Sequence, residues 1–452
     1  MLCRYDVLRA VTGLAIAAAA GCGGKGADRP DAAPAVDAAD IDAAVDAPRD
    51  TAITIKTFPG ALPTYDGRTA NAALVAFQDG DGAWVALTGT GGVYHATATG
   101  PRYGVAVGCT TGASSGVHLY YQSVSDTAEV LADGCLVNPD LLLKLSIDVQ
   151  GLPAGQTAEA WLGAELGVAD SGSPLEVDHP QGMADLFIRT YTRAAGQRVL
   201  HAFVRGGTID LQANAAVQID LGTQGLPPES HPLTLTGLKP SGSATETSSV
   251  HSSYATAHSE LQWPLETRGF AAAAPDSYVT IDATLRKPGD ISNLTAITDG
   301  TTTDGRTYER YVRLAMRTPG PATAALPPIW TATAPSVDRT GVPRATLTFP
   351  ITPGTLGTSD YHASLSTPSA GIFPHTLAVT VRPGWAAGAA SVALTTPDLT
   401  GVAGWTADMG LATDTAVDWS LEWDDRNMPY EALPTDGRKI LGTIISGQIA
   451  AP

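Results

Sequence analysis

One short stretch of the chain matches a catalytic motif. Gly112, Ser114 and Gly116 fit the Gly-x-Ser-x-Gly pattern of a nucleophile elbow, in which a strand precedes the serine and a helix follows it. Here residues 117–121 alternate as in another strand, and no α/β pattern occurs in the chain. The stretch therefore predicts a hairpin loop, and no zinc-protease, phosphate-loop or dinucleotide-binding motif is present. On these grounds the chain is not predicted to be an enzyme.

Two groups of acidic residues could supply the oxygen ligands that Ca²⁺ prefers. The first is Asp79 with Asp81, where a polar hairpin tip is the alternative. The second group, where a solvated strand end is the alternative, consists of Glu422, Asp424, Asp425 and Asn427. Neither follows the spacing of an EF-hand loop, so calcium stays an alternative and no other cofactor is expected. The nine histidines are scattered and are interpreted as surface or hydrogen-bonded residues.

Two tryptophans could bind a sugar. Trp385 and Trp405 lie in glycine-flanked stretches, where an exposed indole ring could stack on a carbohydrate. Large aromatic side chains usually supply buried surface, so packing in the core is the alternative. Trp419 and Trp423 fall on an apolar strand face and are expected in the core.

The first 21 residues predict an export signal. Arg4 and Arg9 precede an apolar run of about ten residues, shorter than the roughly 20 that a membrane-spanning helix needs. Small residues then precede Cys22, and the segment resembles the signal peptide and lipobox of bacterial lipoproteins. The resemblance implies that Cys22 receives a thioether-linked diacylglyceryl group and becomes the mature N-terminus. An ordinary secretory signal cleaved near Ala20 is the alternative.

The segment after the lipobox predicts a tether. Residues 22–50 are mostly Ala, Asp, Gly and Pro and hold too little apolar bulk to fold. A coil of this length spans roughly 30 Å, and two acyl chains hold a protein stably at a membrane. In the lipoprotein family an Asp after the lipidated cysteine commonly means inner-membrane retention, so Gly23 favours the outer membrane, with the protein facing the periplasm or the surface.

Export would give each of the four cysteines a separate role. Cys3 leaves with the signal peptide, and Cys22 takes the lipid. Cys109 and Cys135 remain as one pair in a compartment that permits disulfides. Such a bond would stabilise the fold by about 3–4 kcal/mol in the chain-entropy description. Two separate buried thiols are the alternative, because neither cysteine has the spacing of a metal ligand.

The elements that would position these residues are strands. Apolar and polar residues alternate with a period of two in segment 417–424, which carries Trp419 and Trp423 on its apolar face. The same alternation occurs in segments 279–285, 312–316, 345–349 and 377–381. No stretch of the body keeps a helical apolar pattern for three turns, so the predicted architecture is all-β.

Turn residues divide these strands into modules. Asp-Gly pairs predict turns at 79–82, 299–300, 304–305 and 436–437. Pro and Gly clusters place one β-sandwich module at 51–138, with the cysteine pair, and a second at 139–228. A larger β domain then covers 232–452, and the Pro-rich segment 318–328 either splits it into two sandwiches or crosses it as a loop.

The second module carries a further resemblance. Its segments LSIDVQGLPAGQTAEAWLG and VLHAFVRGGTIDL are similar to carboxypeptidase-regulatory and transthyretin-like sandwiches of secreted bacterial proteins. The resemblance implies a non-catalytic structural or adhesive module and transfers no site residues. The openings of the second module and of the 232–452 domain also share a strand followed by a Gly-Leu turn, which favours tandem Ig-like units.

The formal net charge of −18 limits the partners. It argues against nucleic acid and against direct attraction to anionic lipid. The sequence predicts a membrane-anchored cell-surface or periplasmic lipoprotein with a structural or adhesive role, whose partner is a glycan or a surface protein. A carbohydrate- or calcium-dependent ligand-binding lipoprotein is the alternative. An enzyme whose residues converge from distant strands is a third hypothesis.

Overall fold

The computed structural model describes twelve stretches of the chain. They are residues 50–58, 69–111, 114–132, 142–163, 165–170, 174–194, 197–256, 263–271, 275–368, 374–386, 388–428 and 435–452. Within them lie 28 β-strands, one four-residue α-helix and two short 3₁₀ turns, which confirms the predicted all-β class. No helix in these stretches is long and apolar enough to cross a membrane. The predicted signal peptide, the predicted tether up to residue 49 and Cys135 lie outside the described residues.

The strands form four units of seven, numbered here in chain order. Unit 1 comprises β1 (Thr51–Thr57), β2 (Leu74–Asp79), β3 (Val85–Ala86), β4 (Val93–Ala98), β5 (Arg102–Thr111), β6 (Ser114–Ser123) and β7 (Glu129–Ala132). Unit 2 comprises β8 (Leu142–Gln150), β9 (Thr157–Leu162), β10 (Glu165–Asp170), β11 (Leu175–Pro180), β12 (Gly182–Ala194), β13 (Gln197–Leu211) and β14 (Ala215–Asp220), followed by helix α1 (Leu221–Gln224).

Units 3 and 4 complete the chain. Unit 3 comprises β15 (Glu229–Thr236), β16 (Ser243–Ala255), β17 (Trp263–Ala271), β18 (Ser277–Thr280), β19 (Ile291–Thr302), β20 (Thr307–Met316) and β21 (Ala322–Ala325). Unit 4 comprises β22 (Ser336–Asp338), β23 (Arg344–Pro350), β24 (Thr358–Thr367), β25 (His375–Val381), β26 (Ser391–Thr395), β27 (Val417–Arg426) and β28 (Lys439–Ile449).

Units 1, 2 and 3 share one strand topology. In each, the first strand is the centre of a three-stranded sheet, antiparallel to the fourth strand and parallel to the seventh. The other strands form a four-stranded arrangement in the order third, second, fifth, sixth. In unit 4 the central strand is β23, which is antiparallel to both β22 and β26. Strand β22 thus takes the place that a parallel seventh strand has elsewhere.

Apolar side chains fill the space between the two sheets of a unit. In unit 2, Leu145 and Ile147 from one sheet pack with Ala160, Leu186 and Ile188 from the other. Because side chains of a strand alternate between its two faces, the period-two pattern places one apolar row of each strand inside. Each unit is therefore a β-sandwich, as the sequence predicts.

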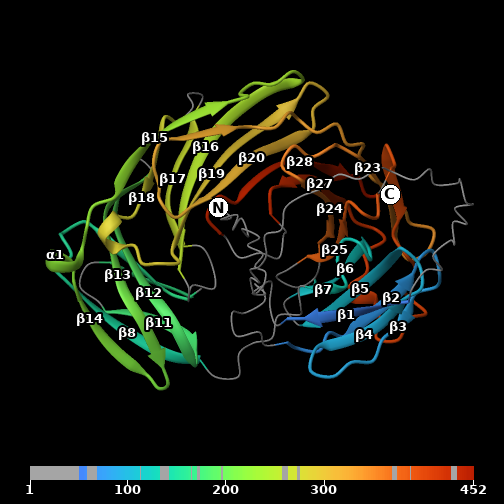
Figure 1. The fold of residues 1–452 in the computed structure, drawn as a ribbon, viewed down its shortest axis with the longest axis horizontal. Helices are drawn as coiled ribbons and strands as arrows, with labels where there is room; N and C mark the ends of the chain where they lie inside the picture. The colour runs from blue at the N-terminus through green and yellow to red at the C-terminus, as the bar shows by residue number, and fades with distance from the viewer. Residues whose placement is uncertain are drawn as a thin grey trace, which may run out of the picture.

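Three of the four units share one continuous sheet. Strand β20 of unit 3 pairs with β28 of unit 4 over eight residue pairs. Strand β25 of unit 4 pairs in parallel with β6 of unit 1 over seven, and these two junctions are called the 3–4 seam and the 4–1 seam. The result is a twelve-stranded sheet. The units lie around an arc in the order 2, 3, 4, 1, with the blue strands of unit 1 beside the orange and red strands of unit 4 (Figure 1).

Beside the 4–1 seam, strand β2 of unit 1 is buried on both of its faces. Val75 and Phe77 of β2 face the core of unit 1. Leu74 and Ala76 of the same strand face the opposite way, into a cluster that contains Val379 of β25. Burial on both sides explains why these four consecutive residues of β2 are all apolar.

Unit 2 contacts unit 3 through side chains. Arg189 of β12 donates to the carbonyl oxygens of Pro264 and Leu265 in β17 at 2.5 and 2.8 Å. Its guanidinium also bonds Glu159 at 2.6 Å and lies 4.7 Å from the centre of the Trp161 ring. Carbonyl groups of the end strand of the long sheet thus receive donors from the neighbouring unit, which protects that edge.

Two local predictions are wrong. Segment 279–285 does not continue as one strand, because β18 ends at Thr280 and a 3₁₀ turn occupies Ala283–Leu285, where the Asp282 side chain accepts from Thr284 N. Residues 299–300 lie inside β19 rather than in a turn. The predicted turns at 79–82 and 304–305 are confirmed as hairpin connections.

Gly116 offers a test of the 4–1 seam. A Cβ atom at this position of β6 would overlap the backbone carbonyl oxygen of Thr376 in β25, so Gly116→Ala must separate the paired strands. We expect a loss of about 1–3 kcal/mol in the free energy of unfolding, measured by urea denaturation. The control Gly401→Ala, where a Cβ meets open space, should change it by less than about 0.5 kcal/mol. Equal stability of the two variants would contradict the close approach at this seam.

Candidate functional site

A continuous series of polar side chains crosses both seams on one face of the twelve-stranded sheet. It is called the polar chain, and its members in order are Tyr120, His118, Thr380, His362, Asp424, Tyr311 and Glu422. These residues come from β6, β25, β24, β27 and β20, which belong to units 1, 4 and 3. Of the clusters of titratable side chains in the described residues, we take this one as the candidate functional site.

Strand alternation and register bring these residues together. In β27, Trp419, Leu421 and Trp423 face the core that β23 shares. Glu422 and Asp424 therefore point to the opposite face. On that face Glu422 lies directly across from His362 of β24. Continuing laterally, His362 lies opposite Thr380, and Thr380 lies opposite Tyr120.

The half of the polar chain at the 4–1 seam consists of hydrogen bonds. The Tyr120 hydroxyl lies 2.9 Å from His118 Nδ1, and the two rings stack with centres 4.0 Å apart. His118 Nε2 lies 2.9 Å from Thr380 Oγ1, which is also 3.1 Å from His362 Nδ1. One threonine hydroxyl therefore joins two imidazoles from different units.

The half at the 3–4 seam centres on Asp424. Its Oδ2 lies 3.8 Å from His362 Nε2, and its Oδ1 accepts a hydrogen bond from the Tyr311 hydroxyl. The same hydroxyl lies 2.5 Å from Glu422 Oε1. Tyr311 reaches β27 across the intervening strand β28, because the residue opposite it there is Gly442. A Cβ atom at Gly442 would overlap the tyrosine ring.

A buried cluster of side-chain ion pairs flanks the polar chain. Asp360 of β24 bonds Arg382 at 2.8 Å and Arg426 at 2.6 Å. Arg426 also lies 3.5 Å from Asp424. Asp360 and Arg426 are both 0% exposed, so each charge depends on its partner rather than on water. Arg426 therefore approaches Oδ2 of Asp424, the same carboxyl oxygen that faces His362.

The environment changes the acidity of three groups. Burial, followed by the charge of Glu422, raises the pKa of Asp424 to about 7, although Arg426 opposes the shift. Burial also raises the pKa of Tyr311, and the nearby carboxylates Asp424 and Glu422 add to this. Burial alone would raise the pKa of Asp360, but Arg382, Arg426 and His362 together lower it. The neighbouring carboxyls Asp360 and Asp424 thus differ in protonation near neutral pH.

The predicted calcium ligands are not gathered in one place. Asp79 accepts from the backbone nitrogen of Thr99 at 3.1 Å, and Asp81 is exposed at a hairpin tip. Asp425 points away from Glu422 and Asp424 and accepts from the backbone nitrogen of Leu356 at 3.0 Å. In the described stretches, no three His, Cys, Asp or Glu side chains are grouped to hold a metal ion. A calcium site therefore gains no support from the geometry.

A solvated strand end does not describe the second acidic group. Asp424 and Asp425 are 6% and 0% exposed. The sheet continues beyond β27 on both sides, into β24 and β28, so the strand is central rather than peripheral. Its polar face is covered by hydrogen-bonded neighbours instead of water.

The two candidate sugar-binding tryptophans lie in different surroundings. Trp385 is 6% exposed, and its ring packs against Tyr121, so it does not offer the exposed face that stacking requires. Trp405 is half-buried and lines a cavity of about 30 Å³ with Leu399 and Met409. That volume is far below the roughly 300–1,000 Å³ of small-molecule pockets. Carbohydrate binding at these residues stays a prediction.

Ser114 and Gly116 of the Gly-x-Ser-x-Gly stretch lie at the start of β6, and Gly112 lies outside the described residues. Strands β5 and β6 are antiparallel partners, so the strand–helix geometry of a nucleophile elbow does not occur. Ser115 in this stretch contacts His375 Nδ1 at 2.8 Å. The same nitrogen contacts the Asp408 carbonyl oxygen at 2.7 Å. A hydrolase triad needs the two ring nitrogens to serve different partners, and this pair does not show that arrangement.

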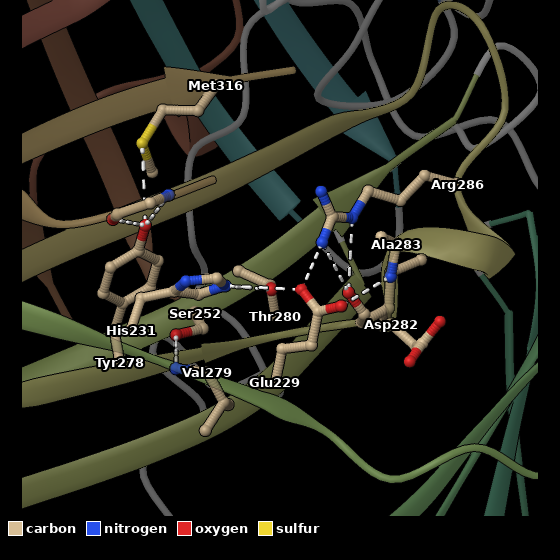
Figure 2. Close-up of polar contacts among 12 residues, drawn as sticks. Glu229, His231, Ser252, Tyr278, Val279, Thr280, Asp282, Ala283, Arg286 and Met316 are labelled. Carbon is tan, nitrogen blue, oxygen red and sulfur yellow. Dashed lines mark hydrogen bonds and ion pairs between the residues drawn. The ribbon is translucent and has the colours of Figure 1, made fainter. Parts of the chain in front are cut away.

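A second histidine cluster lies where β15 meets β18, at the end of unit 3 (Figure 2). His231 Nε2 lies 2.9 Å from the Thr280 hydroxyl and 3.6 Å from Glu229 Oε2. Glu229 also pairs with Arg286 and accepts from Ala283 N at 2.8 Å. One ring nitrogen again contacts both the hydroxyl and the acid, and burial lowers the pKa of His231. We interpret the cluster as structural, joining two strands to the turn that follows.

Sequence reasoning missed most of the polar chain. It singled out Glu422 and Asp424 as acidic residues, but gave His118, His362 and Tyr311 no specific role. These residues are up to about 300 positions apart in the chain, and only strand pairing between units makes them neighbours. The available signal is local, namely polar residues that alternate with buried apolar ones in a central strand. Cys109 lies in β5, and because Cys135 is outside the described residues the disulfide stays a prediction.

Comparisons with known proteins do not place the chain in a family. No protein-family profile and no curated protein sequence matches it. A candidate adhesin from Bacteroides ovatus is similar over 42% of this chain and 91% of its own, with 12% identity and a TM-score of 0.15. The Bacillus anthracis TIE protein (62% and 51%, 9% identity) has a TM-score of 0.16. The FN1–FN3 domains of chicken CNTN1 (77% and 94%, 8% identity) have a TM-score of 0.15.

The raised pKa of Asp424 predicts a pH dependence of stability. Between about pH 4 and 7 the folded chain keeps the Asp424 proton, whereas an unfolded aspartate loses it near 3.9. The contribution of Asp424 to stability is therefore fully present below pH 4 and is lost as the pH rises to 7, at about 1.4 kcal/mol per pH unit.

We expect Asp424→Asn to remove this slope, so that urea denaturation of wild type and variant gives a difference in unfolding free energy that changes between pH 4.5 and 7. Exposed Asp81→Asn is the matched control and should keep a constant difference. A constant difference for Asp424→Asn as well would show that the carboxyl is ionised throughout this range.

Proposed function

We propose that this chain is a lipid-anchored, extracytoplasmic protein whose β-sandwich units form a structural or adhesive scaffold without a catalytic centre. The observation that carries the proposal is the twelve-stranded sheet, which joins units 1, 3 and 4 through backbone pairing. Interfaces between domains of one chain usually consist of side chains and permit relative motion. Backbone ladders of seven and eight residue pairs instead hold the three units at one fixed angle.

Three units held at one fixed angle are better suited to presenting an extended surface than to catalysis. The two hydroxyl–imidazole pairs nearest to a hydrolase arrangement, Ser115 with His375 and Thr280 with His231, each use one ring nitrogen for both contacts. The titratable groups of the polar chain are tied to one another across buried strands. We therefore expect a rigid curved body with hydrogen-bonded polar groups to act by presenting a fixed surface rather than by catalysis.

The anchor is the second part of the proposal. Lipidation of Cys22 would attach the body to a membrane through at least two acyl chains, each contributing about 0.8 kcal/mol per buried CH₂. The Ala/Asp-rich segment to residue 50 would act as a spacer of roughly 30 Å. Its acidic residues would keep the spacer away from anionic headgroups.

Substitution of the lipidated cysteine tests the anchor. In cells that process lipoproteins, we expect Cys22→Ser to move the protein from the membrane fraction to the soluble fraction, since no acyl chain can attach. The matched control is Cys3→Ser, which lies in the predicted signal peptide and should leave membrane partitioning unchanged. Fractionation with immunoblotting and mass spectrometry of the mature N-terminus supply the measurements. A membrane-bound Cys22→Ser protein would refute lipid anchoring at this residue.

An activity panel tests the absence of catalysis. We expect the purified chain to show no turnover of ester, peptide or glycoside substrates above a buffer blank, because neither Ser115 nor Thr280 has a hydrogen-bonded triad. Turnover that disappears in both Ser115→Ala and His375→Ala would identify a working hydroxyl–imidazole pair, and the scaffold proposal would then fail.

A further inference from the structure

We infer that the polar chain can take two opposite hydrogen-bond directions, and that one proton on Asp424 selects between them, so that a proton beside the 3–4 seam sets the hydrogen-bond direction at the 4–1 seam. The inference concerns the internal state of the sheet and does not depend on the proposed anchor or scaffold role. It follows from the numbers of donors and acceptors that each member possesses.

Thr380 is the constraint that couples the two histidines. Its hydroxyl holds one proton and lies within hydrogen-bond distance of His118 Nε2 and His362 Nδ1. It can donate to only one of them, so the other ring nitrogen must donate to the hydroxyl oxygen. The tautomer of His118 therefore fixes the tautomer of His362 as long as both rings are neutral.

In the first direction the donors point toward Asp424. Tyr120 donates to His118 Nδ1, and His118 Nε2–H donates to Thr380. Thr380 then donates to His362 Nδ1, which leaves His362 Nε2–H facing the ionised Asp424 carboxylate. Every acceptor along the path receives one proton, and both imidazoles carry hydrogen on Nε2.

In the second direction the donors point away from Asp424. The protonated carboxyl faces His362 Nε2 through its Oδ2, and His362 Nδ1–H donates to Thr380. Thr380 donates to His118 Nε2, and His118 Nδ1–H faces the Tyr120 oxygen. Both imidazoles now carry hydrogen on Nδ1. The two arrangements differ by one proton, which resides on Asp424 in the second.

The surroundings of Asp424 keep both arrangements accessible near neutral pH. The titratable and charged groups that face it from the packed strands are Tyr311 and Arg313 on β20, Glu422 and Arg426 on β27, His362 and Asp360 on β24, and Arg382 after β25. Burial and Glu422 favour the protonated carboxyl, and Arg426 favours the ionised one, which places its pKa at about 7. Neither form is therefore excluded.

The contact between His362 and Asp424 is the point where the polar chain can be interrupted or connected. The separation of 3.8 Å exceeds the upper end of the N–H···O hydrogen-bond range, about 3.2 Å, by roughly 0.6 Å. A bridging water or a small rotation of the carboxyl completes it in either direction. Tyr311 donates to Oδ1, and Arg426 lies 3.5 Å from Oδ2 and favours its ionised form. The oxygen that faces the histidine can therefore gain or lose a proton without loss of the Tyr311 contact.

Nitrogen NMR of the full mature chain with ¹⁵N-labelled histidine tests the switch, because ¹⁵N shifts distinguish the two neutral tautomers and the imidazolium. In wild type we expect the neutral forms of His118 and His362 to change together from Nδ1–H to Nε2–H as the pH rises through about 7. A single tautomer for either residue from pH 5 to 9 would overturn the inference.

Variants at Thr380 separate coupling from coincidence. Thr380→Val removes the shared hydroxyl at nearly constant volume, so the change at His118 near pH 7 should disappear. Thr380→Ser should keep it, and Thr376→Val, on the same face of β25, is the matched control that should also keep it. Asp424→Asn should abolish the change at both histidines, and a change that persists at His118 in Thr380→Val or Asp424→Asn would refute a shared switch. If Thr380→Val does not fold, the Asp424→Asn and Thr380→Ser spectra decide alone.

Discussion

The structure depends on how the edge strands of its four-stranded sheets are paired. An edge strand exposes a row of unpaired N–H and C=O groups, and proteins must cover or pair them. Here β20, β28, β25 and β6 would each be an edge if the units stood alone, and they pair with one another instead. Four potential edges are removed by two seams. The same bonds that protect the edges also set the order of the units, in which unit 1 lies beside unit 4 although unit 2 follows it in the chain.

The seams determine what the sheet can carry on its polar face. Polar side chains that are buried on a face of the sheet lose access to water and need partners. Asp360 between Arg382 and Arg426, and Asp424 beside Tyr311, are arrangements of this kind. The hydrogen bonds of the polar chain reinforce the 4–1 seam through Thr380 and the 3–4 seam through Tyr311. Its one gap is the 3.8 Å separation of His362 and Asp424.

Local patterns in the sequence are sufficient to predict the strands, but they do not predict which strands pair with one another. The alternation in segment 417–424 correctly predicts β27, and the glycines at 79–82 correctly predict a hairpin. Gly300 was wrongly predicted as a turn residue, because glycine also serves where another backbone or ring approaches closely, and here a Cβ would overlap the Tyr308 ring. The seams themselves join residues about 140 and 260 positions apart, such as Thr307 with Ser446 and Ser115 with His375. No local period records such pairings, so the candidate site could not be assembled from the sequence.

The junctions between units differ in kind, and this difference decides where the arc can bend. The two seams consist of backbone ladders, which fail only if many hydrogen bonds break together. The contact of unit 2 with unit 3 consists of side-chain interactions. They are a buried apolar cluster that includes Phe187, Phe203, Tyr254 and Leu265, Arg189 on the β17 carbonyls, and Arg205 with Asp290 at 2.6 Å. Buried ion pairs of this type contribute little net stability, but they are very costly to break singly, since one charge is then left without its partner. Small displacements at that contact can keep the Arg205–Asp290 pair and the neighbouring side-chain contacts, whereas a seam permits none without a loss of register. Bending of the arc should therefore concentrate between units 2 and 3, while units 3, 4 and 1 move as one body.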